Sequence, residues 1–148
     1  MASYNKSRDD EKKKKNESYT AEHFAVILSV SIVRAMSRAD KYYRFTICRE
    51  VEHLSYDILH ELRRANEQWL GSEKRVEHQN IALEKTKDFK DLLKVLEGCR
   101  CITIGEKADI DNRADIVKQK ISNWMENDKV RINRRELEKL KYLKKPES

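Results

Sequence analysis

The chain has 148 residues, of which 39% are charged, with only three glycines and one proline and a formal net charge of +6. This length suits one domain with a single core, and the scarcity of turn-forming residues excludes an all-β or doubly wound fold. Long helices on short connections are indicated instead. The longest apolar run, residues 24–33, is too short to cross a bilayer. No convincing signal-peptide cleavage site accompanies it, so we expect a soluble, cytoplasmic protein.

The positive charge is concentrated at the two ends of the chain. Residues 1–18 carry six basic and four acidic side chains, residues 129–148 carry eight and three, and residues 19–128 are close to neutral with 18 and 19. The N-terminal segment has too few apolar residues to offset the entropy of ordering it, so we expect it to be disordered. A basic end can bind a polyanion by counterion release. A merely solubilising tail is the alternative.

The first expected helix covers residues 20–38. One face is formed by Phe24, Ile27, Leu28, Ile32 and Ala35, and Val26, Val30 and Val33 widen it. A helix that is apolar over so wide an angle is either central or covered on two sides. The second cover would come from a neighbouring subunit.

The stretch KYYRFTICRE, residues 41–50, favours a β-strand by local propensity. The pattern that follows does not alternate, because apolar side chains recur every three or four positions at Ile47, Val51, Leu54, Ile58, Leu62, Ala65 and Trp69. This is the period of an amphipathic helix. The period outweighs the propensity and predicts one helix over about 41–69.

A third helix is expected over about 73–97, with Ser72 as its N-cap and Gly98 as the glycine that ends it. Its apolar stripe is Ala82, Thr86, Phe89, Leu93 and Leu96.

Thr103 and Glu106 form a capping-box pattern that should open a fourth helix over about 104–127, with the stripe Ile110, Ala114, Val117, Ile121 and Trp124. Asn133 and Glu136 repeat the pattern and predict a separate, short basic helix over 134–144. The sequence therefore predicts an all-α, antiparallel up-down four-helix bundle. Its expected divisions are a disordered tail over 1–18, the bundle over 19–128 and a basic C-terminal extension over 129–148.

No catalytic constellation is found in the sequence. His53 and His60 are seven positions apart but lack the Glu-x-x-His partners of a di-iron bundle. Gly-rich phosphate loops, GxSxG and cysteines paired to a base are also absent. The three cysteines, Cys48, Cys99 and Cys101, lack zinc-ligand spacing and are expected to be reduced, partly buried thiols on helices. We therefore expect no enzymatic activity, no metal and no cofactor. A metal-dependent bundle enzyme is the weaker alternative.

The segment YRFTICREVEHLSYDILHELRRANE, residues 43–67, resembles the second-helix signature of four-helix-bundle proteins related to the accessory variability determinants of diversity-generating retroelements. The shared features are Arg44-Phe45-Thr46 and Arg64-Ala65-Asn66, with Cys48 where the family has glycine. Residues 88–103 resemble the leucine-rich third helix of that family. Trp124 stands where its fourth helix ends in Gly-Gly-Trp, although Ser122 and Asn123 precede it here. The resemblance spans about residues 24–128.

Members of that family form pentameric barrels that dock on a reverse transcriptase and help it bind template RNA. The resemblance therefore implies a non-catalytic homo-oligomer, a pentamer, that scaffolds a reverse transcriptase with its template RNA in cDNA synthesis. A similar set of bundles, encoded in large-subunit rRNA intervening sequences, has no settled activity. Family members that bind nucleic acid are strongly basic over the body, whereas this body is neutral. The alternative is a generic protein–protein interaction bundle without nucleic-acid binding.

The candidate contacts to RNA or an RNA/DNA hybrid are basic side chains in three places: the corner between the second and third helices, the fourth helix and the C-terminal segment. They are Arg63, Arg64, Lys74, Arg75, Lys118, Lys120, Arg131, Arg134, Arg135, Lys139, Lys141, Lys144 and Lys145. Each is also compatible with an ordinary solvated surface charge.

Overall fold

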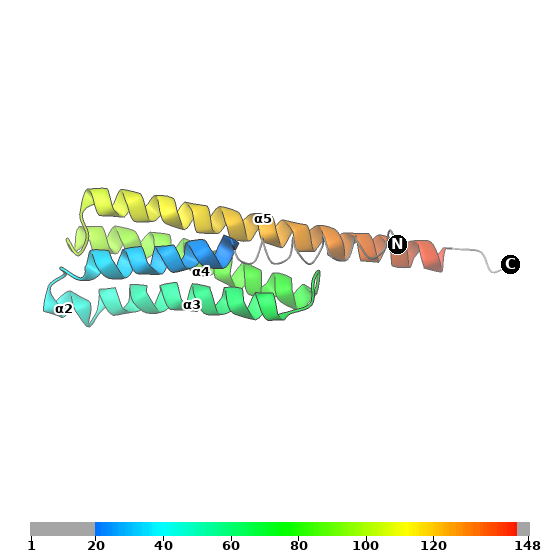
Figure 1. Ribbon diagram of the computed structural model, residues 1–148, viewed down its shortest axis with the longest axis horizontal. Coiled ribbons are helices and arrows are strands. Elements are labelled where there is room, and N and C mark those ends of the chain that lie inside the picture. The colour runs from blue at the N-terminus through cyan, green and yellow to red at the C-terminus, as the bar shows by residue number, and fades with distance from the viewer. Residues whose placement is uncertain (1–19, 145–148) are drawn as a thin grey trace.

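The computed structural model describes residues 20–144, which form helices and short connections without any strand (Figure 1). After a helical segment over 20–36 come α2 (Lys41–Arg44), α3 (Ile47–Glu67), α4 (Glu73–Gly98) and α5 (Ile104–Leu143). The four long helices lie side by side and alternate in direction. The expected all-α four-helix bundle is confirmed. The expected disordered tail and Lys145 lie outside the described residues.

The core is built from the faces that the apolar period predicted. Within the described residues, the largest fully buried apolar side chains come from all four long helices: Leu28, Ile32, Ile58, Leu62, Phe89, Leu93, Leu96, Ile110, Ile121 and Trp124. No helix in this part of the chain is both long enough and apolar enough to cross a membrane. The bundle is therefore held by the burial of one stripe from each long helix.

The expected single helix over 41–69 begins at Lys41 as predicted, but it is broken near its start and ends at Glu67. A break at Phe45 and Thr46 separates α2 from α3, and Thr46 has φ −115° and ψ −103°, outside the helical region. The Thr46 hydroxyl donates to the Tyr42 carbonyl at 3.0 Å, which offers the backbone of α2 a local partner in place of the helical ladder. We call residues 37–46 the elbow. At the other end α3 stops at Glu67, and Trp69 is 87% exposed in the connection to α4.

The end of α4 also differs from the expected one. Gly98 is the last helical residue, and the left-handed position is taken by Arg100, with φ 58°. The N–H of Cys101 donates to the Leu96 carbonyl at 2.8 Å, as in a Schellman cap that is completed two residues later than predicted. Of the three cysteines only Cys48 lies within a helix, while Cys99 and Cys101 lie in the connection that follows α4.

Helix α5 is continuous over 40 residues, so the expected break near residue 128 and the separate helix over 134–144 are wrong. The Thr103–Glu106 capping box is present at its start. Asn133 and Glu136 lie inside the helix and are exposed. Between Gly105 and Pro146 the chain has no glycine or proline, and nothing in that stretch ends a helix. At ~1.5 Å per residue α5 is about 60 Å long, and it projects past the α3–α4 connection (Figure 1).

Candidate nucleic-acid interface

Three of the four candidate side chains at the α3–α4 corner are accessible. Arg63, Arg64 and Lys74 are exposed. Arg63 lies 3.9 Å from Glu67, and Arg64 lies 2.5 Å from Glu61, both within α3. The Arg63–Glu67 pair is exposed and therefore weak, so the Arg63 guanidinium can turn to a phosphate at small cost, whereas Arg64 is held by the buried Glu61.

The fourth candidate, Arg75, is wrong as a surface contact, because its side chain is completely buried. Its Nε donates to Asp128 at 2.8 Å, and its guanidinium carbon lies 4.7 Å from the ring centroid of Trp124. Arg75 precedes the buried Gln79 and Ala82 at helical spacing, so it continues the apolar stripe of α4 toward its N-terminus. A charged residue on the core face needs a buried partner, and Asp128 is that partner.

The carboxylate of Asp128 accepts hydrogen bonds from several groups at this end of the bundle. Besides Arg75, it accepts from Gln79 Nε2 at 2.7 Å, from the Gly71 backbone N–H at 2.9 Å and from Arg131 at 3.1 Å. We call these side chains, with Trp124, the Asp128 cluster. Because the cluster joins the α3–α4 connection to α5, it fixes the corner against the point where α5 leaves the bundle.

The close approach of connection and helix requires the glycine at position 71. Gly71 has φ +69°, which L-residues rarely adopt. A Cβ placed there would lie 2.9 Å from Arg131 Cβ and 3.3 Å from a guanidinium nitrogen of Arg135. The corner and the first basic residues of the projecting part of α5 are therefore brought together, although about 60 residues separate them in the sequence.

The C-terminal part of α5, residues 129–143, begins beside the α3–α4 connection and projects past it. We call it the α5 extension, and it carries a basic column. Arg131, Arg135 and Lys139 recur every four positions, and Tyr142, 82% exposed, follows three positions later. The column continues the line of the buried Trp124 and Asp128, so the face of α5 that meets the core inside the bundle becomes basic where the bundle ends.

The opposite face of the extension is apolar. Val130, Leu137 and Leu140 are 39%, 59% and 51% exposed, and we call them the extension ridge. Val130 and Leu137 each stand nine positions after a buried residue, Ile121 and Asp128. Nine positions are about two and a half helical turns, so the ridge points away from the bundle axis. Arg134 and Lys141 flank it, and both are exposed, as is Lys144.

Trp69 is the residue of this surface that the sequence pattern missed. Its spacing from Ala65 suggested a core position, but α3 ends at Glu67 and the side chain is exposed beside the corner. Asn66 and the nearby Gly71 were the signals for an earlier helix end. An exposed indole among basic side chains is the usual platform for a stacked base.

Lys118 and Lys120 lie apart from this surface and from each other. Lys118 lines a groove between α4 and α5 with Lys87, Lys90 and Asp111, where Lys90 pairs with Asp115 and Asp111. Lys120 lies 5.8 Å from the ring centroid of Phe24 in the first helix. The corner and the α5 extension therefore form the candidate interface, and these two lysines do not extend it.

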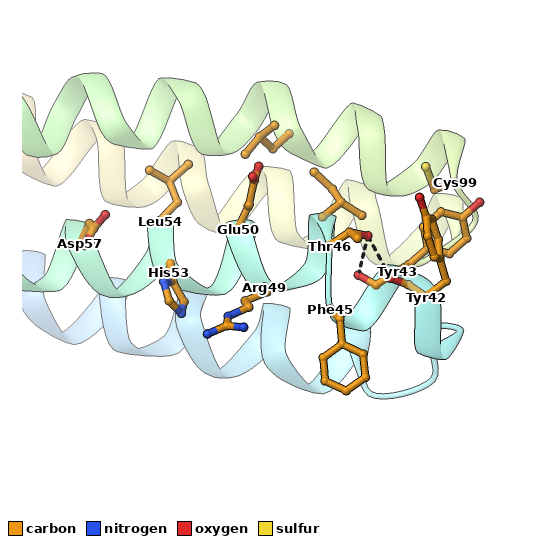
Figure 2. A pocket seen from close by; sticks show the side chains of 12 residues that line it. Tyr42, Tyr43, Phe45, Thr46, Arg49, Glu50, His53, Leu54, Asp57 and Cys99 are labelled. Carbon is orange, nitrogen blue, oxygen red and sulfur yellow. Dashed lines mark hydrogen bonds between the residues drawn. The ribbon is translucent and has the colours of Figure 1, made fainter.

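A groove of about 870 Å³ lies at the other end of the bundle, between the elbow, α3 and α4 (Figure 2). Its floor includes Tyr43, Ile47, Leu54 and Leu92, all partly buried. Figure 2 shows Glu50 and Leu54 pointing toward α4, whereas Phe45, Arg49 and His53 point to the opposite side of α3. We call it the elbow groove.

Two of the thiols, those of Cys48 and Cys101, are buried and are poor nucleophiles. Burial raises the pKa of Cys48 to about 12, and burial also raises the pKa of Cys101. A thiol in this state carries almost no thiolate at neutral pH. Within residues 20–144 no group of three or more His, Cys, Asp or Glu side chains is arranged to hold a metal ion.

Comparison with known proteins supports the fold and gives no information about function. No protein-family model matches the chain, and no curated protein matches it. A solved structure from Bacteroides thetaiotaomicron, described as a protein of unknown function from the S23 ribosomal protein family, is similar to it with a TM-score of 0.66. The two sequences are 16% identical, and the alignment covers 74% of this chain and 98% of the other.

Proposed function

We propose that the chain is a non-catalytic accessory protein that binds single-stranded RNA at the corner and the α5 extension and presents it to a reverse transcriptase. The observation that carries the proposal is that the α3–α4 connection, which holds the exposed Trp69, lies against Arg131 and Arg135 of the basic column at one end of the bundle. Aromatic platforms among basic side chains are the physical requirement for binding a single strand without sequence preference. The reverse transcriptase as partner rests on the resemblance of residues 43–67 to accessory variability determinants.

Assembly into a homo-oligomer, a pentamer by the same resemblance, is part of the proposal. Val26, Val30 and Val33, which we call the valine stripe, are 48%, 43% and 37% exposed on the first helix. They form one line at helical spacing beside the core face. An apolar line of this kind is what a neighbouring subunit would cover. Val30→Glu should therefore lower the molecular mass measured by light scattering, while an exposed substitution elsewhere, Glu84→Gln, should leave it unchanged.

The RNA part is tested by fluorescence, because the two tryptophans differ in exposure. Trp69 is 87% exposed and Trp124 is 1% exposed, so a base that stacks on Trp69 should quench the emission of that indole alone. Because Trp69→Ala removes this signal, its affinity is measured by the fluorescence anisotropy of a dye-labelled single-stranded RNA. It should be about tenfold weaker, since stacking contributes roughly 1–3 kcal/mol per base.

Phe45→Ala is the matched control, because Phe45 is also an exposed aromatic residue, at 67%, but lies at the opposite end of the bundle. It should leave RNA binding unchanged. Equal losses in the two variants, or no binding to the unmodified protein at low salt, would remove the proposal. The partner is tested by co-elution of the purified chain with a reverse transcriptase encoded beside it.

A generic protein-interaction bundle is the second candidate, and the neutral charge of residues 19–128 favours it. The dependence of the binding constant on salt concentration distinguishes this candidate from the RNA-binding one. Contacts to phosphates make the logarithm of the binding constant fall linearly with the logarithm of salt concentration, by roughly 0.7 per phosphate on single strands. A partner bound through apolar surface would show a nearly flat response.

A further inference from the structure

We infer that the extension ridge of one copy docks as a helix in the elbow groove of a second copy, so that copies join head to tail. The inference deepens the homo-oligomeric part of the proposed function and makes no use of RNA binding. The starting observation is that the ridge cannot be covered by its own bundle. Val130 and Leu137 lie on the side of α5 opposite to the buried Ile121 and Asp128, and the extension projects past the α3–α4 connection (Figure 1).

A projecting helix with an exposed apolar line has no surface of its own chain against which to bury that line. The extension has 15 residues, 129–143, which is about the length at which an isolated helix is marginal in water. Leu137 and Leu140 are both more than half exposed. Side chains at such spacing are the usual anchors of a helix that lies in an apolar groove. The extension therefore has the features of a helix that binds in an apolar groove of another protein surface.

The elbow groove has the matching apolar floor. Ile47, Leu54 and Leu92 are partly buried and line it between α3 and α4. Its length along α3, from Ile47 to Asp57, is about 15 Å at ~1.5 Å per residue. The ridge from Val130 to Leu140 is also about 15 Å long by the same measure. The floor can thus receive the whole ridge.

The charges of the two surfaces indicate that the α5 extension of a second copy occupies the elbow groove. Residues 129–144 carry seven basic and two acidic side chains. The groove is bordered by Glu50 and Asp57 of α3, whereas Arg49, which also lines it, points away from α4. Glu50 and Asp57 are seven positions apart, as are Arg134 and Lys141 beside the ridge, so both pairs span about 10 Å. Asp57 also lies 3.6 Å from Lys85, but that pair is partly exposed and therefore weak. Two opposite charges at equal spacing fix the register of the docked helix.

The same charges argue against the ridge pairing with a second ridge. In an antiparallel pair the flank with Arg134 and Lys141 would face its own copy, and like charges at such positions are unfavourable. Docking of ridge into groove uses different surfaces on the two partners, so it is a heterologous contact, which forms rings or open chains of copies.

The test uses two chains that each block one side of the contact. Both carry Val30→Glu, so that the valine stripe does not contribute. The ridge-blocked chain has Leu137→Glu and Leu140→Glu, and the groove-blocked chain has Glu50→Lys and Asp57→Lys. All four sites are exposed, so the fold should be retained, and equal circular dichroism and unfolding midpoints check this.

Sedimentation equilibrium is the measurement. The chain with Val30→Glu alone should gain mass as its concentration rises, and each blocked chain should stay a monomer. An equimolar mixture of the blocked chains should give a complex of twice the monomer mass, because one supplies the groove and the other the ridge. A chain with Arg134→Glu and Lys141→Glu should in turn pair with the groove-blocked chain.

Three outcomes overturn the inference. The Val30→Glu chain could be monomeric at all concentrations, which means that the ridge has no partner among copies of the chain. The groove-blocked chain could associate with itself, which means that ridges pair with each other or elsewhere. The mixture could remain monomeric while the parent associates, which means that ridge and groove belong to different contacts. None of these results bears on RNA binding, so the two proposals fail separately.

Discussion

Asp128 is the residue on which the end of the bundle depends. It is fully buried and accepts hydrogen bonds from Arg75, Gln79, Arg131 and the backbone of Gly71. We expect Asp128→Ala to lower the free energy of unfolding by about 3–5 kcal/mol, because it leaves the Arg75 guanidinium buried without its counter-charge. Urea denaturation followed by circular dichroism measures this loss.

Asp109→Ala is the control for this change, since Asp109 also pairs with an arginine, Arg113 at 3.0 Å, but is exposed. It should cost less than about 1 kcal/mol. A loss of that size for Asp128→Ala as well would mean that the cluster does not hold the α3–α4 connection to α5. A double variant with Arg75→Met should recover part of the loss, because the uncompensated charge is then gone.

Glu61 should make the free energy of unfolding of the bundle depend on pH in the acidic range. Burial alone would raise the pKa of its carboxyl group, but hydrogen bonds from His78 at 2.8 Å and from Arg64 outweigh burial and hold the pKa below the ordinary value of 4.5. A carboxyl group whose pKa is lower in the folded chain stabilises it above the unfolded pKa, and this contribution is lost as the pH falls through the folded pKa.

The variant Glu61→Gln should therefore be less stable than the unmodified chain at neutral pH, by about 1 kcal/mol. The difference should be constant down to the ordinary value of 4.5 and should shrink below it. Unfolding midpoints in urea measured at several pH values give the difference directly. A gap between the two proteins that widened on acidification would contradict the assignment. Glu84→Gln, at an exposed position, should show no such gap.

At the scale of elements, α5 joins two parts of different stability. Up to Asp128 its inner face is buried, whereas 133–143 are exposed throughout. Amide hydrogen exchange in a monomeric variant, such as the ridge-blocked chain, should show strong protection over Ile110–Asp128 and little over 134–143. The reason is that the extension can unfold locally without opening the core. Uniform protection along the whole of α5 would contradict this division.

The sequence predicted the elements well wherever one face is buried. The three- and four-residue spacing located the cores of all four long helices, because burial imposes that period on the side chains. The same spacing did not predict correctly where the helices end. Trp69 fitted the spacing but lies beyond α3, and the Asn133–Glu136 pattern suggested a helix start inside α5. From Lys107 to Leu143 α5 has no glycine or proline that would interrupt it, so the capping pattern at Asn133 and Glu136 was not informative there.

The candidate site was predicted in part, and the errors have one physical cause. Arg75 was assigned to the surface by its charge, although its spacing from Gln79 and Ala82 placed it on the core face. Trp69 was assigned to the core by its apolar character, although it follows the end of α3. In both cases residue type was weighed above position. The partner of Arg75 lies 53 positions away in the sequence, which no local pattern contains.

For the whole molecule, the arrangement of charge matters more than its total. The net charge of +6 is carried by the ends of the chain, and the structure places the basic column of Arg131, Arg135 and Lys139 on one face at one end. Replacing these three residues by glutamine lowers the net charge by three. A matched variant, Lys41→Gln with Lys87→Gln and Lys94→Gln, lowers it equally at exposed positions on the bundle.

If RNA binds at the basic column, the first triple variant should lose at least about tenfold in affinity at low salt, and its salt slope should fall by about two. The second should keep nearly the affinity of the unmodified chain, because removing distant charges changes only the screened long-range attraction. Fluorescence titrations of Trp69 at several salt concentrations give both quantities. Equal losses in the two variants would mean that RNA responds to the net charge, and the assigned surface would then have no special role.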